Sequence, residues 1–312
     1  MHNMIFKTNF KGIEAVQLEN ELLRVIVLPK LGGKIASLYS KSKDFELVYQ
    51  SGEDKYKEPI VYSDFAIFDA SGFDDAFPSI YASTVKVGSL DVEYPDHGEI
   101  WSSSFSYEIK DEKALLYYNS SILSYYYKKS ISLKNDRVLV EYEIINTGEP
   151  AFPCIWTAHY LVNCEEDMML LLPENTCKVI NVSKSSHLGD INKIHSYPIT
   201  KNLIGENYSL NRIYPSSAEK CEKYYVNGDL TKGECGIYYP HKDLTYKLYF
   251  DKVIFPYLGF WVTEGGFRGD YNCALEPSNG FYDGIDIANN NKKLFVLASG
   301  EKIKFNMEIE LI

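Results

Sequence analysis

Residues 124–146 read SYYYKKSISLKNDRVLVEYEIIN, and this stretch indicates how the chain folds. Two runs rich in β-branched and aromatic residues, 124–133 and 137–146, flank the short sequence KND. β-Branched and aromatic residues favour strands, whereas Asn and Asp tolerate the backbone angles of tight turns. The stretch therefore predicts an antiparallel β-hairpin.

The same strand-like pattern recurs on both sides of this hairpin. Residues 84–94 predict a second hairpin around Gly88, and residues 22–28 predict a strand that ends before Pro29. One short helix is expected, at residues 216–225, where Ser and Glu stand in the first turn. Further strands are expected at 245–250, 294–298 and 302–312. Many short strands at close spacing predict an all-β sandwich or barrel.

Two stretches, residues 48–80 and 181–232, lack clean periodicity. We expect them to leave the sheets as excursions, and loops on a rigid scaffold often carry functional sites. No Pro/Ser-rich linker, charge block or fixed repeat divides the chain. The sequence therefore predicts a single domain over residues 1–312.

The composition excludes several classes of protein. Of the 312 residues, 45% are hydrophobic and 24% are charged, a globular balance that excludes disordered, fibrous and coiled-coil chains. No apolar run reaches about 18 residues, and the N-terminal residues lack the apolar region of a signal peptide. The six cysteines form no C-x-x-C pair. We therefore expect a cytoplasmic protein with reduced thiols.

The charge of the chain bears on its partners. Lys and Arg number 32 and Asp and Glu number 43, which gives a net charge of −11. So acidic a chain is repelled by nucleic-acid phosphates and by anionic membranes. We expect no nucleic-acid and no membrane partner, and a neutral small molecule fits the charge better. A homodimer is left open.

Aromatic residues are unusually abundant, with 26 Tyr, 16 Phe and 3 Trp. Tyr favours strands and is amphipathic, so the composition first indicates half-wetted sheet faces. A cleft lined by rings, which would hold a ligand, is the alternative.

Three segments hold candidate chemistry. His97 stands beside a glycine in YPDHGEIW, where a ligand can approach the backbone and Trp101 offers a flat apolar face. His159 lies in the apolar run IWTAHYLV, either as a satisfied core residue or as a desolvated acid or base. Glu276 ends an apolar stretch before a Pro-Ser-Asn-Gly turn, either as an exposed strand-end residue or as a general base.

Motifs for metals and cofactors are missing. The His-x-Glu of residues 97–99 lacks the P-C-x-x-C partner of zinc deaminases, and neither H-E-x-x-H, a phosphate-binding loop nor G-x-S-x-G occurs. We therefore expect no metal and no cofactor. His, Glu and aromatic rings together suit proton transfer on a neutral polyol. The residues alone leave open a carbohydrate binder or an acid–base enzyme.

Taken together, these segments resemble the galactose mutarotase-like (aldose 1-epimerase) family from about Glu19 to the C-terminus. The resemblance is carried by five motifs in the family's order, namely LENELLRV (18–25), LPKLGGKI (28–35), His97-Gly98, WTAH (156–159) and LEP (275–277). The first two resemble the family's opening strands and glycine turn. The last three resemble its substrate-binding His-Gly pair and the strands that bear its acid histidine and base glutamate.

The resemblance implies a β-supersandwich of large antiparallel sheets with few short helices and an open sugar cleft. It also implies a cofactor-free interconversion of α and β sugar anomers. Glu276 would take the proton from the C1 hydroxyl while His159 protonates the ring oxygen, which is general acid–base catalysis. His97 would orient the sugar.

The chain also departs from the family. Residues 71–78 read SGFDDAFP and carry no Arg, where the main branch has an Asn-Arg pair, and its Asp-His element is not evident. The sequence resembles a separate bacterial branch. We therefore expect Asp74, Asp75 and Glu99 to recognise sugar hydroxyls, with Trp101 and Trp261 as stacking faces. So acidic a pocket disfavours a phosphorylated sugar.

The sequence thus predicts an aldose mutarotase or a closely related sugar epimerase, with a sugar as its partner. Fold does not fix function, so a non-catalytic carbohydrate-binding or sensing protein on the same scaffold is the alternative. A lyase or glycosidase is a third hypothesis. Glycosidases use two carboxylates, which the stretch around Asp74 and Glu276 could supply.

Overall fold

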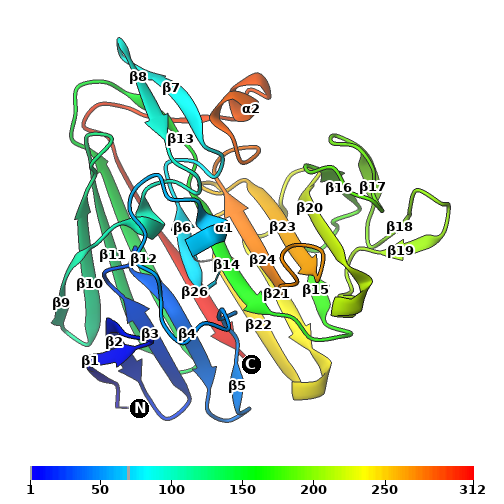
Figure 1. Cartoon of the computed structure of the whole chain (residues 1–312), viewed down its shortest axis with the longest axis horizontal. Helices are drawn as coiled ribbons and strands as arrows, with labels where there is room; N and C mark the ends of the chain where they lie inside the picture. The colour runs from blue at the N-terminus through cyan, green and yellow to red at the C-terminus, as the bar shows by residue number, and fades with distance from the viewer. Residues whose placement is uncertain (1, 69–70) are drawn as a thin grey trace.

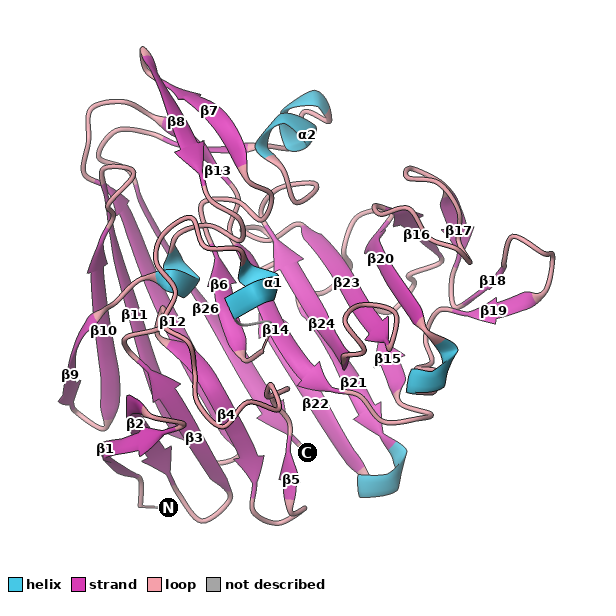
Figure 2. Cartoon of the chain, viewed as in Figure 1, coloured by secondary structure: helices cyan, strands magenta, loops and turns pink. Residues whose placement is uncertain are grey.

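Two large antiparallel sheets dominate the computed structural model, which describes residues 2–68 and 71–312 (Figures 1 and 2). Within the described residues the larger sheet has 12 strands in the order β1-β2-β3-β4-β6-β14-β24-β23-β20-β16-β17, with β5 beside β4. Its strands are β1 (Met4–Phe10), β2 (Ile13–Glu19), β3 (Leu23–Leu28), β4 (Lys34–Ser40), β5 (Phe45–Glu46), β6 (Phe73–Ala76), β14 (Thr157–Asn163), β16 (Lys178–Asn181), β17 (Ile194–Ser196), β20 (Lys220–Val226), β23 (Tyr257–Glu264) and β24 (Tyr271–Ser278).

The second sheet has 8 strands in the described part of the chain, in the order β15-β21-β22-β26-β12-β11-β10-β9. Its strands are β9 (Ser106–Lys110), β10 (Lys113–Asn119), β11 (Tyr125–Lys134), β12 (Arg137–Asn146), β15 (Met169–Leu171), β21 (Glu234–Tyr239), β22 (Leu244–Phe250) and β26 (Lys302–Leu311). The chain crosses between the two sheets several times, so neighbouring strands are often distant in sequence.

The remaining elements are short. Among the residues that the structure describes, three two-stranded sheets pair β7 (Ser83–Val87) with β8 (Leu90–Tyr94), β13 (Phe152–Cys154) with β25 (Phe295–Leu297), and β18 (Ile199–Lys201) with β19 (Asn207–Ser209). The helices are α1 (Phe65–Phe68), α2 (Ile285–Asn290) and the 3₁₀ turns η1 (Ile100–Ser102), η2 (Ser216–Ala218) and η3 (Pro240–Lys242). Among the described residues, no helix has the length and apolar character needed to cross a membrane.

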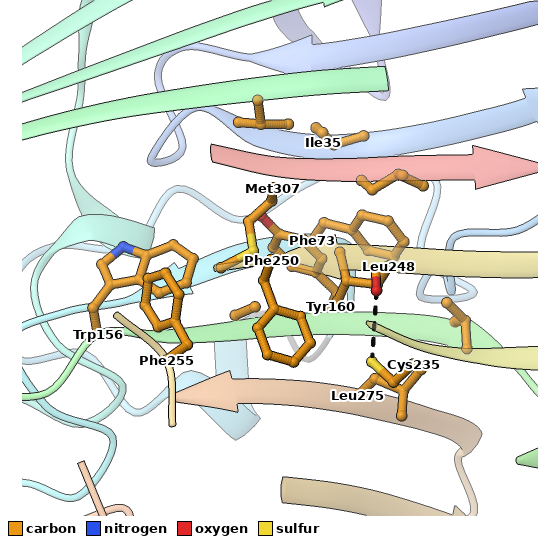
Figure 3. Close-up of a cluster of buried hydrophobic side chains, with 14 of the residues drawn as sticks. Ile35, Phe73, Trp156, Tyr160, Cys235, Leu248, Phe250, Phe255, Leu275 and Met307 are labelled. Carbon is orange, nitrogen blue, oxygen red and sulfur yellow. Dashed lines mark hydrogen bonds between the residues drawn. The ribbon is translucent and has the colours of Figure 1, made fainter. Parts of the chain in front are cut away.

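The main hydrophobic core lies between the two large sheets. β12 alternates strictly between half-buried and buried residues, as expected for a strand with one wet and one dry face. Figure 3 shows how side chains from the larger sheet, such as Phe73, Tyr160 and Leu275, meet Leu248 and Met307 from the second sheet. This packing makes the fold an all-β supersandwich.

The hairpin predicted at residues 124–146 is confirmed. β11 and β12 pair antiparallel and close with Lys134 opposite Arg137, while Asn135 takes a left-handed backbone angle of φ 57° in the turn. The hairpin around Gly88 is confirmed as β7 and β8. All six cysteines lie in the described part of the chain and are free thiols.

The helix expected at residues 216–225 is wrong. Only the turn η2 forms, and Glu219 then adopts a left-handed conformation that ends it. The residues that follow are rich in Tyr and Val, and they form β20, which pairs with β23. Sheet pairing outweighs the weak local helix signal here.

Candidate active site

A cavity of about 410 Å³ opens on the face of the 12-stranded sheet that points away from the core. Its floor comes from β14, β20, β23 and β24. Its walls come from the start of α1, the loops before β7 and η1, and the loop between β23 and β24. The floor residues are His159, Leu161, Lys223, Trp261, Asn272 and Glu276. The wall residues include Phe65, Tyr81, Asp96, His97, Phe267 and Asp270.

Strand alternation decides which side chains reach this cavity. In β14, His159 faces the cavity while Tyr160 packs into the core. In β24, Glu276 faces the cavity while Leu275 packs into the core. The register that pairs Tyr160 with Leu275 places His159 opposite Glu276 on the neighbouring strand. Residues directly opposite on one face have Cβ atoms about 4.5–5.5 Å apart. The two groups can therefore act on one small chemical centre.

His159 is buried at the floor of the cavity, with 6% of its surface exposed. Burial lowers the pKa of His159 well below its ordinary value, and the positive charges of His97, Lys223 and Lys34 lower it further. Its Nδ1 has no hydrogen-bond partner among the described residues. The resting imidazole is therefore neutral at neutral pH.

His97 faces His159 from the wall. Its Nδ1 lies 2.8 Å from Asp96 Oδ1, its ring stacks on Phe65 at 4.2 Å between centroids, and it meets the His159 ring edge-on at 5.0 Å. Burial alone would raise the pKa of Asp96, but the hydrogen bond and charge of His97 outweigh burial and lower it. Asp96 thus orients the His97 ring toward the cavity.

The glycine of the His-Gly pair is required by the backbone. His97 itself has φ 56° and Gly98 has φ 75°, both in the left-handed region. A Cβ on Gly98 would lie 2.0 Å from the carbonyl oxygen of Phe77. The chain can pass this close to residue 77, and so hold His97 in the wall, only with glycine at this position.

Glu276 is fully buried, and its carboxylate forms an ion pair with Lys223. Lys223 Nζ lies 2.9 Å from Glu276 Oε2. Burial raises the pKa of Glu276, and the Lys223 ammonium opposes that rise only in part. The site thus holds a desolvated carboxylate beside a neutral imidazole.

Of the expected stacking faces, Trp261 lines the cavity and Trp101 lies behind its wall. Trp261 projects from β23, and its ring meets Phe267 edge-on at 5.7 Å. Trp101 is 2% exposed, packs edge-on against Phe65 and donates its Nε1 hydrogen to the Asp96 carbonyl at 2.9 Å. Trp101 supports the wall and offers no open face to a sugar.

The three carboxylates expected to recognise hydroxyls lie apart. Asp74 shares the cavity face of the sheet, directly opposite His159 in register, but it is 3% exposed and its Oδ2 pairs with Lys34 at 2.7 Å. Asp75 points the other way, into the core between the sheets. There it pairs with Lys129 at 2.9 Å. Consecutive residues of a strand must face opposite sides, so both could not reach one sugar.

Glu99 is also turned away from the cavity. It is fully buried and accepts hydrogen bonds from the hydroxyl groups of Tyr118 at 2.8 Å and Ser121 at 3.0 Å, and from Ser120. These contacts fix the loop between β10 and β11 to the turn that follows His97. Glu99 is therefore a structural residue of this turn.

Several lining residues were not identified from the sequence. Lys223 stands in KYYV, where a charged residue among buried tyrosines on a strand was an available signal. Asp96 lies inside the quoted YPDHGEIW motif, next to His97. Phe65 lies in the stretch 48–80 without periodicity, so only the structure reveals its place. In the described part of the chain, no group of three or more His, Cys, Asp or Glu side chains could hold a metal ion.

The sequence model of a family described as a domain of unknown function, DUF5107, matches residues 3–263. The chain belongs to the DUF5107 family. The match takes in His97, His159 and Lys223 and ends before Glu276. No curated protein matches this DUF5107 chain.

Solved structures match nearly the whole DUF5107 chain. The Slr1438 protein of Synechocystis sp. PCC 6803 has a TM-score of 0.72 at 16% identity, covering 100% of this chain and 99% of that one. A galactose mutarotase related enzyme from Lactobacillus acidophilus has a TM-score of 0.70 at 13% identity, covering 99% and 97%. A galactose mutarotase-like protein from Lactobacillus casei ATCC 334 has a TM-score of 0.70 at 17% identity. The match covers 96% of this chain and 100% of that one.

These likenesses confirm the expected fold. The DUF5107 chain has the galactose mutarotase-like β-supersandwich, and the resemblance seen in its motifs is borne out at the level of architecture. At sequence identities of 10–17%, the similarity to these structures shows the fold alone. The chemistry depends on the residues of the site itself.

Proposed function

We propose that this protein is an aldose mutarotase, or a closely related sugar epimerase, that interconverts anomers by cofactor-free acid–base catalysis. One observation carries the proposal: His159 and Glu276 lie opposite each other on the floor of a cavity. The hydroxyl and ring oxygens of a sugar hemiacetal are both attached to C1. Two groups a few ångströms apart can therefore reach both oxygens at once.

Glu276 is the base in this mechanism. Its carboxylate removes the proton from the C1 hydroxyl while His159 delivers a proton to the ring oxygen. The bond between C1 and the ring oxygen breaks, and the open-chain aldehyde forms. Rotation about the C1–C2 bond exposes the other carbonyl face, and the reverse proton transfers close the ring as the second anomer.

The charges of the site fit these roles. One proton leaves the hydroxyl and one arrives on the ring oxygen, so His159, which is neutral at rest, must first take up a proton from solvent to act as the acid. Its lowered pKa makes the imidazolium a strong acid when it forms. The raised pKa of Glu276 makes its carboxylate a stronger base than an exposed one. Trp261 gives the C–H face of the sugar an apolar surface.

The first test compares wild type with Glu276→Gln. Exchange between anomers is measured by NMR magnetisation transfer for D-glucose, D-galactose, D-xylose and L-arabinose. We expect the variant to lose about 10²–10⁴-fold of the catalysed exchange while still binding the sugar, because the amide cannot accept the proton. Glu222→Gln is the control, since Glu222 is a buried carboxylate on the opposite face of the same sheet.

The outcome separates the proposals. Faster exchange with wild type and with Glu222→Gln, but not with Glu276→Gln, supports the mutarotase. Sugar binding without any acceleration favours a carbohydrate-binding or sensing protein on this fold. Release of sugar from a glycan would favour a glycosidase.

A further inference from the structure

Lys223 sits at the centre of a buried chain of charges. Its Nζ lies 2.9 Å from Glu276 Oε2 and 2.7 Å from Asp283 Oδ2. Asp283 Oδ1 in turn accepts a hydrogen bond from the Tyr225 hydroxyl at 2.8 Å. The lysine side chain is 9% exposed, and both carboxylate side chains are fully buried. A cation so placed is costly to bury and is held by its two partners.

The sheet is built to let Lys223 reach Glu276. Lys223 lies on β20 opposite Trp261 of β23, whereas Glu276 lies one strand further on, opposite Gly259. Neighbouring strands are about 4.8 Å apart, so the lysine must cross β23. Gly259 leaves space for the Tyr225 ring beside this path, because a Cβ there would lie 2.8 Å from that ring.

We propose that Lys223, held between Glu276 and Asp283, is a positioning residue that keeps the Glu276 carboxylate ionised and aimed at the sugar. This proposal rests on the proposed function of Glu276 as the base. A carboxylate buried without a cation takes up a proton, and a protonated carboxyl group cannot accept another from a hydroxyl. The ion pair therefore maintains the base in its working form.

The geometry also directs the carboxylate. Oε2 of Glu276 takes the ion pair with Lys223, while Oε1 has no hydrogen-bond partner among the described residues. Holding one oxygen fixes the orientation of the other. Glu276 thus has one oxygen anchored to the protein and one available to the C1 hydroxyl.

The charges around Glu276 act in opposite directions. Burial raises its pKa, Lys223 lowers it, and Asp283 raises it again, while His97 lowers it from the wall. His159 is opposite in register. The remaining titratable neighbours are Tyr81 and Tyr225, and the charge of Glu276 helps to raise the pKa of both phenols. Lys223 and Asp283 are thus expected to shift the titration of Glu276 with opposite signs.

The experiment tests these opposite effects of Lys223 and Asp283 on the titration of Glu276. Lys223→Met keeps the length of the side chain without its charge, and Asp283→Asn keeps the shape of the carboxyl group without its charge. The pH dependence of anomer exchange is recorded from pH 4 to 9 for each variant, with the aldose that wild type converts fastest. Exchange rises with pH as Glu276 ionises and falls again as His159 loses its proton, and the midpoint of the rising limb is measured.

We expect Lys223→Met to move this midpoint up by at least one pH unit, which lowers exchange about tenfold at pH values below the midpoint. Asp283→Asn should move the midpoint down. Lys129→Met is the matched control, because Lys129 forms a buried ion pair with Asp75 on the core face. That variant should lose stability and leave the midpoint unchanged.

A purely structural role for Lys223 predicts a different result. Both variants would then lower exchange by a constant factor at every pH, or leave the midpoint where it is in wild type, and either result overturns the proposal. Partial recovery by Lys223→Arg, which restores the positive charge, would support it.

A second measurement does not depend on activity. The carboxyl carbon of Glu276 is followed by ¹³C NMR, with the signal assigned by its loss in Glu276→Gln, while the pH is changed. A higher titration midpoint in Lys223→Met supports the role of Lys223 even if wild type accelerates no sugar, in which case the proposed function alone fails. An unchanged midpoint overturns the role of Lys223.

Discussion

Asp74 and Asp75 are neighbours in one strand, but their side chains lie on opposite faces of the sheet and have different roles. Asp74 is on the cavity face and pairs with Lys34, whereas Asp75 enters the core. There Asp75 accepts hydrogen bonds from Tyr142 at 2.9 Å and from Lys129 at 2.9 Å. A charge buried this deeply is stable only while its partner remains.

Removing the charge of Asp75 should therefore destabilise the protein. Asp75→Asn leaves the Lys129 ammonium without its counter-ion in the core, which costs about 3–5 kcal/mol of the free energy of unfolding. Urea unfolding measures this loss. The contrast is Asp91→Asn, which breaks an exposed pair with Lys86 and should cost less than about 1 kcal/mol. Equal stability of the two variants would contradict the structural role of Asp75.

Individual site residues were predictable to different degrees. His159 and Glu276 each stand in an apolar strand-like run, where a lone polar group is conspicuous. The orientations of Asp75 and Glu99 could not be predicted in this way, because Asp75 depends on how β6 sits in the sheet and Glu99 on the turn before η1. Lys223 meets Glu276 only through the pairing of β20, β23 and β24, and nothing local in the sequence encodes that pairing.

At the level of elements, β20 and β23 carry a second set of buried carboxylates on the face away from the cavity. Glu222 and Glu264 are each 2% exposed. Burial raises the pKa of both to about 7, from an ordinary value of 4.5. His187 Nδ1 lies 3.5 Å from Glu222, and Lys220 is opposite Glu264 in the strand register.

These carboxylates should make the protein less stable as the pH rises. Between about pH 4.5 and 7 the folded state holds protons that the unfolded state has released, so the free energy of unfolding falls with increasing pH. Glu264→Gln removes one charge that folding must bury. It should raise stability at pH 8 by on the order of 1–3 kcal/mol and flatten the pH dependence.

Urea unfolding at pH 5 and pH 8 tests this expectation. The amide oxygen of Gln can still accept the backbone N–H of Tyr214, which donates to Glu264 Oε1 at 2.6 Å, so the substitution keeps the local contact. Glu58→Gln, at an exposed position, serves as the control and should leave the free energy of unfolding unchanged at both pH 5 and pH 8. A lower stability of Glu264→Gln at pH 8 would contradict the assignment.

The hairpins and the last strand were predictable because their signals are local. In β11 and β12 the alternation of residues and the Asn-Asp turn lie within one short stretch, and no distant contact is needed to interpret them. The error at residues 216–225 has the opposite origin. A few polar residues suggested a helix, but the edge of β23 offered Tyr224 and Tyr225 a better partner.

For the whole molecule, the decisive feature is a row of residues that crosses the centre of the larger sheet. Neighbouring strands place Asp74, His159, Glu276, Gly259 and Tyr225 side by side on one face. These residues come from five strands, and apart from the hairpin of β23 and β24 these strands are separated by long stretches of sequence. The cavity is thus a product of the topology, and a long-range strand order of this kind is invisible to local patterns.

Because the cavity spans the middle of this sheet, occupying it should stabilise the entire fold. A ligand that binds only the folded state at one hundred times its Kd adds about 2.7 kcal/mol. With an unfolding entropy of about 2.1 cal/mol/K per residue over 312 residues, this corresponds to a rise in Tm of about 4 °C. The rise should increase with the logarithm of the sugar concentration. Thermal unfolding across the aldose panel measures it.

Two aromatic variants decide whether the rise originates in the cavity. Trp261→Ala removes the ring from the cavity floor and should abolish most of the shift, whereas Tyr126→Ala removes a ring from the outer face of the second sheet and should preserve it. An equal shift in both variants would mean that the sugar binds elsewhere. A Tm shift that disappears with Trp261→Ala but survives in Glu276→Gln would show that Trp261 binds the sugar and that Glu276 is not needed for binding. Acid–base catalysis on a sugar held against an aromatic ring requires this separation of binding from chemistry.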